Sequence, residues 1–166
     1  MAERLPQGAG VVYRPFGSPD AETEGRRLAA VCRRRGLILL VGFDEALALA
    51  LGAHGLHLPE RAVGRMPALQ ARHPHWIVTG AAHDAAAVAR AASAGLHAAL
   101  LSPVFASASP SAGEPLGLER FSEIARAANL PVYALGGVTA ANAPSLEGSG
   151  AAGVAAVEGV LEAWAD

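Results

Sequence analysis

The sequence predicts a parallel α/β fold built as one domain over residues 1–166, either a barrel or a doubly wound sheet. Three observations lead to this prediction. Short apolar segments alternate with helical ones, and they are continuously apolar, as expected of parallel strands covered on both faces. A helix also ends in glycine shortly before a strand at Gly52, Gly95 and Gly150, where glycine can adopt the left-handed conformation.

Seven apolar runs are predicted to form the strands. A closed (β/α)8 barrel has eight strands and typically more than about 200 residues. The count of seven in a chain of 166 residues therefore suggests that one βα unit is lacking or truncated. In chain order, the strands are predicted at Val11–Arg14, Leu37–Val41, Gly55–Leu58, Trp76–Thr79, Ala98–Pro103, Val132–Leu135 and Gly153–Val157.

Six helical segments lie between these strands. In the fifth, apolar side chains recur along one face with helical spacing, which indicates a helix packed against the sheet. The first ends in three arginines, which complement the helix dipole and are interpreted as a solvated terminus. The helices are predicted at Asp20–Arg35, Asp44–Leu51, Met66–His73, Asp84–Ala94, Leu118–Ala128 and Ala140–Gly148.

Composition and charge narrow the classes of partner. The chain is 52% apolar, enough for one sizeable core, and its net charge of −2 gives no reason to expect nucleic acid or an anionic membrane. No run approaches the roughly 20 apolar residues of a membrane span, and no apolar leader opens the chain, so a cytoplasmic protein is expected. The single cysteine, Cys32, is interpreted as a core residue.

Two glycine turns near the end of the chain indicate a phosphorylated ligand. Gly136 and Gly137 follow the sixth predicted strand, and Gly159 follows the seventh. Backbone N–H groups at such turns can converge on an anion, and the dipole of a following helix would add to their attraction. The loops after the last two strands are where (β/α) barrels hold phosphate. The alternative, that these glycines only turn the chain, stays open.

The same turns place the incomplete part of a barrel at the N-terminus. If they follow the seventh and eighth strands, the missing strand is the first, and residues 1–10 are too short for a full βα unit. Either these residues supply a partial strand, another chain covers the edge, or the barrel stays open. Because an uncovered edge invites association, a homodimer is expected.

Several motifs occur in an order typical of one family. They are Val12-Tyr13-Arg14, Phe43-Asp44 at a helix start, Gly55-Leu56-His57-Leu58-Pro59, Ala81-Ala82-His83-Asp84, Ser102 to Ser109, Pro115-Leu116-Gly117-Leu118 and the two closing glycine turns. With these motifs the chain resembles, from Val11 to its end, the thiamine phosphate synthase/TenI superfamily of small TIM barrels. The resemblance implies a TIM barrel and a role in thiamine biosynthesis.

The resemblance implies a phosphate site. In that family the two closing turns hold the phosphate of a thiazole phosphate or thiamine phosphate, which assigns phosphate binding to Gly136, Gly137 and Gly159. Arg14 matches a strand-end arginine that can reach an anion. Two serines in the loop after the fifth strand, Ser107 and Ser109, are candidates to bind the phosphate or the thiazole through their hydroxyl groups.

Residues for the synthase reaction are only partly present. Synthases of this family join an aminopyrimidine pyrophosphate to a thiazole phosphate and use Mg²⁺ and cationic groups to stabilise the departing pyrophosphate. Asp44 matches one metal-ligand aspartate, so Mg²⁺ is implied if synthase activity is retained. The second aspartate falls at Ala62, the expected lysine at Pro110, and the asparagine before Asp44 is Phe43.

The motif His57-Leu58-Pro59-Glu60 and the short loop after it are more similar to the TenI branch, whose characterised members aromatise a thiazole phosphate by moving a proton. That reaction needs a positioned acid or base. The histidine used by some tautomerases falls at Pro103, which leaves His83 as the candidate catalyst and His57 as a second one. The alternative for His83 is a structural hydrogen bond to the backbone.

Two hypotheses about function follow. The chain is an enzyme that acts on a thiazole phosphate, either a TenI-like tautomerase or a synthase-like transferase. Alternatively, it is a catalytically degenerate homologue that binds a thiamine-related phosphate without turnover.

Overall fold

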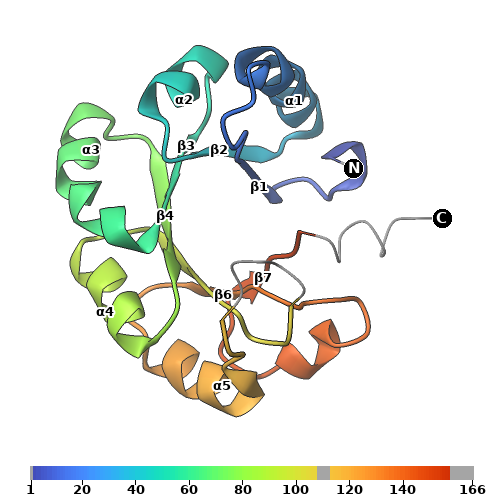
Figure 1. Cartoon of the computed structure of the whole chain (residues 1–166), viewed down its shortest axis with the longest axis vertical. Helices are drawn as coiled ribbons and strands as arrows, with labels where there is room; N and C mark the ends of the chain where they lie inside the picture. Colours follow the sequence, from blue (N-terminus) through green and yellow to red (C-terminus); the bar gives the residue numbers. More distant parts are fainter. Residues whose placement is uncertain (1, 108–112, 158–166) are drawn as a thin grey trace.

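The structure, a computed structural model, describes residues 2–107 and 113–157. Within these residues seven parallel strands form one sheet in the order β1-β2-β3-β4-β5-β6-β7, so each strand pairs with the next one along the chain. The sheet curls into an open barrel with the helices on its outside, and β1 and β7 are its edges (Figure 1). This confirms the seven-stranded barrel. It excludes the doubly wound sheet, in which the strand order would reverse.

Most strands lie within two residues of their predicted ends. They are β1 (Gly10–Tyr13), β2 (Ile38–Gly42), β3 (Gly55–Leu58), β4 (Ile77–Ala82), β5 (Ala98–Leu101), β6 (Val132–Ala134) and β7 (Gly153–Val154). The last is only two residues long, shorter than the predicted Gly153–Val157. Residues 2–9 contribute a 3-10 turn, Ala2–Arg4, and no strand, which agrees with a missing first βα unit. The homodimer stays a prediction.

Five α-helices cover the described part of the barrel. Their bounds are α1 (Ala21–Arg35), α2 (Glu45–Leu51), α3 (Met66–Arg72), α4 (Ala85–Ser93) and α5 (Gly117–Ala127). Asp44 and Asp84 begin α2 and α4 as N-caps, because their carboxylates accept hydrogen bonds from the backbone N–H groups of Leu47 at 2.9 Å and Ala87 at 2.7 Å. Gly52 ends α2 in the left-handed conformation, as the sequence predicts.

The predicted helix Ala140–Gly148 is wrong. The structure has only a 3-10 turn there, η3 (Ala143–Leu146). Thr139 and Asn142 bond each other's backbone N–H groups through their side chains, and Pro144 has no N–H to continue a helix. The helix dipole expected behind the Gly136–Gly137 turn is therefore absent from the described chain, and any attraction for an anion at this turn comes from its own N–H groups.

The core lies inside the barrel and between the sheet and the helices. Strand residues such as Leu58 and Leu101 have no exposed surface, and Phe121 on α5 is equally buried. Each such side chain contributes about 1.5–3 kcal/mol of hydrophobic stabilisation. Cys32 is 1% exposed, which confirms it as a core residue.

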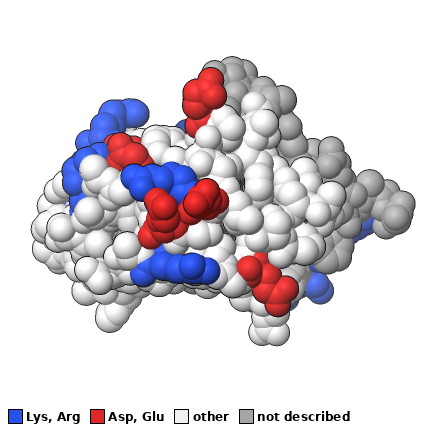
Figure 2. All heavy atoms as spheres, turned by 90° about the horizontal axis from the view of Figure 1, so that it is seen from below, with Lys and Arg blue, Asp and Glu red and all other residues white. Residues whose placement is uncertain are grey.

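On the face drawn in Figure 2, positive and negative side chains are not separated into patches of a single charge. There, arginine and acidic side chains lie among one another on a largely uncharged surface. Among the residues that the structure describes, no helix is both long and apolar enough to span a membrane.

Candidate active site

A cleft of about 1510 Å³ opens at the carboxyl ends of the strands. The loops after β1 to β6 all contribute to its walls, because parallel strands end at the same rim of a barrel. It brings together six of the residues predicted from the sequence, which are Arg14, His57, His83, Ser107, Gly136 and Gly137. Two further predictions, Ser109 and Gly159, lie outside the described residues. Asp44 does not line this cleft.

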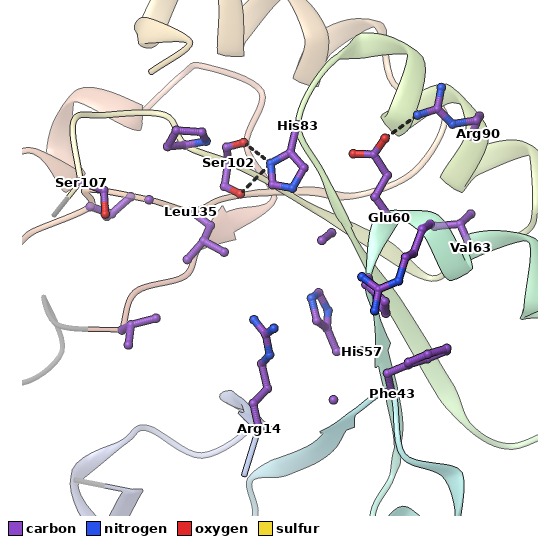
Figure 3. A pocket seen from close by; sticks show the side chains of 18 of the residues that line it. Arg14, Phe43, His57, Glu60, Val63, His83, Arg90, Ser102, Ser107 and Leu135 are labelled. Carbon is purple, nitrogen blue, oxygen red and sulfur yellow. Dashed lines mark hydrogen bonds and ion pairs between the residues drawn. The ribbon is translucent and has the colours of Figure 1, made fainter. Parts of the chain in front are cut away.

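His83 follows β4 directly and is anchored to the chain just after β5. Its Nδ1 lies 2.8 Å from the carbonyl oxygen of Ser102 and 3.5 Å from the hydroxyl oxygen of the same residue. Because a carbonyl oxygen only accepts, Nδ1 donates its proton to Ser102, and the lone pair of the neutral ring is on Nε2. Nε2 lies on the side of the ring away from Ser102, toward the open cleft (Figure 3). The predicted structural hydrogen bond from His83 to the backbone is therefore present, and it leaves Nε2 available for acid–base chemistry.

His57, on β3, is the second histidine of the cleft and is only 8% exposed. Its Nδ1 lies 2.9 Å from Oγ1 of Thr79 on β4. Burial, and to a smaller extent the positive charge of Arg14, lowers the pKa of His57 from 6.5 to about 4. His57 is therefore neutral at neutral pH and acts in the cleft as a hydrogen-bonding group rather than as a charge.

Arg14 follows β1 and crosses β2 to reach the cleft. Its aliphatic stem occupies the space above Gly42, where an added Cβ would lie 2.7 Å from Cγ of Arg14. The guanidinium carbon lies 4.8 Å from the centre of the Phe16 ring. Arg14 points into the cleft next to His57 (Figure 3). It brings a positive charge to the wall of the cleft.

Gly136 and Gly137 form the turn after β6, and both have left-handed backbones, with φ of 89° and 64°. The adjacent loop after β5 leaves no room for a side chain, since a Cβ on Gly137 would lie 2.2 Å from the carbonyl oxygen of Ala106. Asn142 braces the turn, because its amide donates to the carbonyl oxygen of Gly137 at 2.8 Å. Glycine is therefore required here by packing and backbone conformation, whatever the turn binds.

The same turn offers donors to a ligand. Among the described residues, no hydrogen bond uses the backbone N–H groups of Gly136, Gly137 or Val138, and all three residues line the cleft. Backbone N–H groups without a partner attract anions most strongly where water is partly excluded. A phosphate held at this turn lies within the same cleft as His83.

Arginine outnumbers carboxylate along the described walls of the cleft. Arg14, Arg61 and Arg90 line it, whereas Glu60 is the one acidic residue among the described residues that do so. Nη2 of Arg90 donates to Oε1 of Glu60 at 2.6 Å. The cleft therefore carries an excess of positive charge and suits an anionic ligand.

Among the described residues, those predicted to bind Mg²⁺ do not form a site on their own. Oδ1 of Asp44 caps α2, and Asp44 lines a separate hollow of about 150 Å³ together with Arg65 and with Glu45, which is paired with Arg72. Ala62 has no ligand atom in its side chain, and Glu60 is paired with Arg90. Among the described residues there is no group of three or more His, Cys, Asp or Glu side chains with metal-binding geometry.

Sequence reasoning missed the partners of the two histidines. Ser102 lies 19 positions from His83 in the chain, and Thr79 lies 22 positions from His57. No local sequence pattern indicates contacts over such separations. One indirect signal pointed to Ser102. It immediately precedes Pro103, the position at which some tautomerases have their histidine. The sequence gives no signal that the side chain of Phe43 forms part of the cleft wall.

Comparison with known proteins gives the family. A family model described as thiamine monophosphate synthase matches residues 7–160. A putative thiamine-phosphate synthase 2 of Aquifex aeolicus is 33% identical over 138 residues, which is 82% of this chain and 73% of that protein. A thiamine-phosphate synthase of Roseiflexus sp. (strain RS-1) is 35% identical over 145 residues, 87% of this chain and 61% of that protein.

The chain spans only part of some relatives. A bifunctional thiamine biosynthesis protein of Symbiobacterium thermophilum is 38% identical over 82% of this chain, which corresponds to 29% of its own length. A solved structure of thiamine phosphate pyrophosphorylase from Pyrococcus furiosus shares the fold, with a TM-score of 0.79 and 22% identity over 94% of this chain and 76% of that one. With the family model matching nearly its whole length, the chain belongs to the thiamine monophosphate synthase family.

Proposed function

We propose that this chain is an enzyme of thiamine biosynthesis that acts on a thiazole phosphate by transferring a proton, with His83 as the catalytic base and acid. The observation that carries this proposal is the bond from Nδ1 of His83 to the carbonyl oxygen of Ser102, which fixes the ring and, in the neutral tautomer, leaves the lone pair on Nε2 toward the cleft. Membership of the family and the names of the relatives support the thiamine pathway.

The phosphate of the ligand would bind at the turn after β6. The N–H groups of Gly136 and Gly137 donate to its oxygens, and the excess of arginine in the cleft favours its negative charge. Ser107 lines the cleft on the neighbouring loop, which supports a role for its hydroxyl group at the same end of the ligand. Binding of the phosphate would thus position the thiazole ring next to His83.

The proton transfer needs no co-reactant. Nε2 of His83 takes a proton from a ring carbon of the non-aromatic tautomer, and the electron pair of that C–H bond moves into the ring. The imidazolium keeps its Nδ1–H bond to Ser102, which stabilises the positive charge. Nε2 then returns the proton to a different atom of the ligand. The product is an isomer, and His83 ends as it began.

The synthase reaction is the second candidate, because the relatives carry that name. It needs a site for pyrophosphate and Mg²⁺, and the residues that would form one do not fit it, since Asp44 is a helix cap and Ala62 replaces the second aspartate. No step of the proposed reaction passes through a metal ion.

The test is to incubate the protein with the non-aromatic tautomer of thiazole phosphate in D₂O and follow aromatisation and deuterium uptake by NMR. We expect turnover with deuterium in the product, and a loss of about 10²- to 10⁴-fold in kcat for His83→Ala. His75→Ala, an exposed histidine away from the cleft, is the matched control and should keep full activity.

Three other outcomes would overturn the proposal. Unchanged turnover in His83→Ala would remove the assigned catalyst. Binding of thiazole phosphate without turnover would identify a degenerate homologue. Formation of thiamine phosphate from aminopyrimidine pyrophosphate and Mg²⁺, with no isomerisation, would identify a synthase.

A further inference from the structure

One aromatic side chain stands in the wall of the cleft without a role in the proposed proton transfer. Phe43 follows β2, and among the described residues it is the only Phe, Tyr or Trp that lines the cleft. It is 37% exposed, so part of its ring is accessible from the cleft. Figure 3 shows it on the same wall as His57.

The backbone holds Phe43 in this position at a cost. Its φ is 53°, in the left-handed region that bulky residues rarely adopt. Its N–H donates to the carbonyl oxygen of His57 at 3.0 Å, which ties it to the end of β3. Glycine would relieve the strain, so the backbone conformation of the turn alone does not explain why a ring stands here.

Arg65 lies against the same ring. Its guanidinium carbon is 5.1 Å from the centre of the Phe43 ring, within the range of a cation–π contact. Phe43 lines both the cleft and the small hollow next to it, whereas Arg65 lines only the hollow. The ring therefore separates the guanidinium group from the cleft.

A cation beside one part of an aromatic ring alters what the rest of the ring attracts. The guanidinium draws the π-electron density toward itself, which weakens the attraction of the ring for a second cation. A neutral heteroaromatic ring can still stack on it. The arginines that line the cleft add to the penalty for a cationic ring.

From this arrangement the geometry points to Phe43 as the stacking platform for the ring of the bound phosphate ester, and to Arg65 as a residue that makes the cleft prefer a neutral thiazole over a cationic thiazolium. This inference rests on the proposed function, because it takes the ligand to be a thiazole phosphate. It adds a preference for the neutral-ring phosphate over thiamine phosphate, whose thiazolium ring is positively charged.

Calorimetry with three ligands tests it. Inorganic phosphate probes the glycine turn alone, thiazole phosphate adds a neutral ring, and thiamine phosphate adds a cationic one. We expect Phe43→Leu to weaken thiazole phosphate about fivefold and to leave inorganic phosphate unchanged, while Phe43→Tyr keeps the affinity. Phe43→Asn is the second ringless variant, since asparagine tolerates the left-handed backbone and keeps the fold. Arg65→Gln should narrow the preference for thiazole phosphate over thiamine phosphate.

The outcomes separate this inference from the proposed function. If the wild-type protein binds thiazole phosphate and both ringless variants bind it equally well, the platform is wrong and the proposed function is untouched. An unchanged preference in Arg65→Gln would overturn the role of Arg65. If turnover survives in His83→Ala while Phe43→Leu loses affinity, the catalytic assignment fails and the platform stands. A wild-type protein that binds none of the three ligands overturns both.

Discussion

Gly136 and Pro103 are in such close contact that a Cβ on Gly136 would lie 2.7 Å from both Cα and Cβ of Pro103. Pro103 follows Ser102, the residue that anchors His83. The turn assigned to the phosphate and the residue that positions the base are therefore packed against each other. A displacement of either one is transmitted to the other, because the contact involves backbone atoms.

Gly136→Ala is expected to lose both stability and ligand affinity. Because of the φ of 89° and the contact with Pro103, the added methyl group should lower the unfolding free energy by about 2 kcal/mol or more. Urea denaturation would measure this loss. The control is Gly148→Ala, where φ is 72° but an added Cβ has no atom within 4 Å, so that only the backbone cost of about 1 kcal/mol applies. Equal losses in the two variants would show that the packing against Pro103 does not matter.

Asp44→Ala is expected to behave as the loss of a helix cap. Removing the acceptor of the Leu47 N–H group should lower the unfolding free energy by about 1 kcal/mol, and Asp44→Asn, which keeps an acceptor, should lose much less. Affinity for thiazole phosphate should be the same in all three proteins, with or without Mg²⁺. Should Mg²⁺ tighten binding in the wild type and fail to do so in Asp44→Ala, the assignment of Asp44 as only a cap would have to be abandoned.

The lowered pKa of His57 predicts that the folded protein loses stability in mild acid. Its pKa is about 4 in the folded protein and near 6.5 in the unfolded chain, so protons bind preferentially to the unfolded state. The stability it contributes is complete above about pH 6.5, falls as the pH drops toward 4 and changes no further below that, with a total on the order of 3 kcal/mol. His57→Gln should flatten the pH dependence of the urea midpoint in this window. The same slope in wild type and variant would assign it to other groups.

The lowered pKa of Glu45 predicts a second loss of folding stability at lower pH. Hydrogen bonds from Arg72 and His73 hold the pKa of Glu45 at about 2, below its usual value of 4.5. Because the folded pKa is the lower one, the stabilisation is present above about pH 4.5 and disappears as the pH falls through 2. Glu45→Gln should remove this part of the acid transition in a thermal melt series from pH 5 to 2. A transition that keeps its shape in the variant would contradict the assignment.

Much of the fold and part of the candidate site follow from sequence patterns. Apolar runs and helix-ending glycines indicate seven parallel strands, because burial on both faces and left-handed caps are local requirements. Since parallel strands end at one rim, the positions of Arg14, His83 and the Gly136–Gly137 turn after their strands already place them in one cleft. The helix after that turn was predicted wrongly, because the mutual bonds of Thr139 and Asn142 compete with helix formation.

The chemistry of the individual side chains depends on residues that are distant in the sequence. Ser102 determines which nitrogen carries the proton in neutral His83, burial beside Thr79 and Arg14 keeps His57 neutral, and the Leu47 N–H group of α2 binds one carboxylate oxygen of Asp44. The amino-acid sequence by itself determined a parallel α/β fold and which loops lie at the carboxyl ends of its strands, because periodicity and glycine positions are local properties, whereas the strand order of the structure showed that the sheet is a barrel. Only the tertiary structure decided what each group in the cleft can do, because proton affinity and hydrogen bonding are set by neighbours that folding brings together.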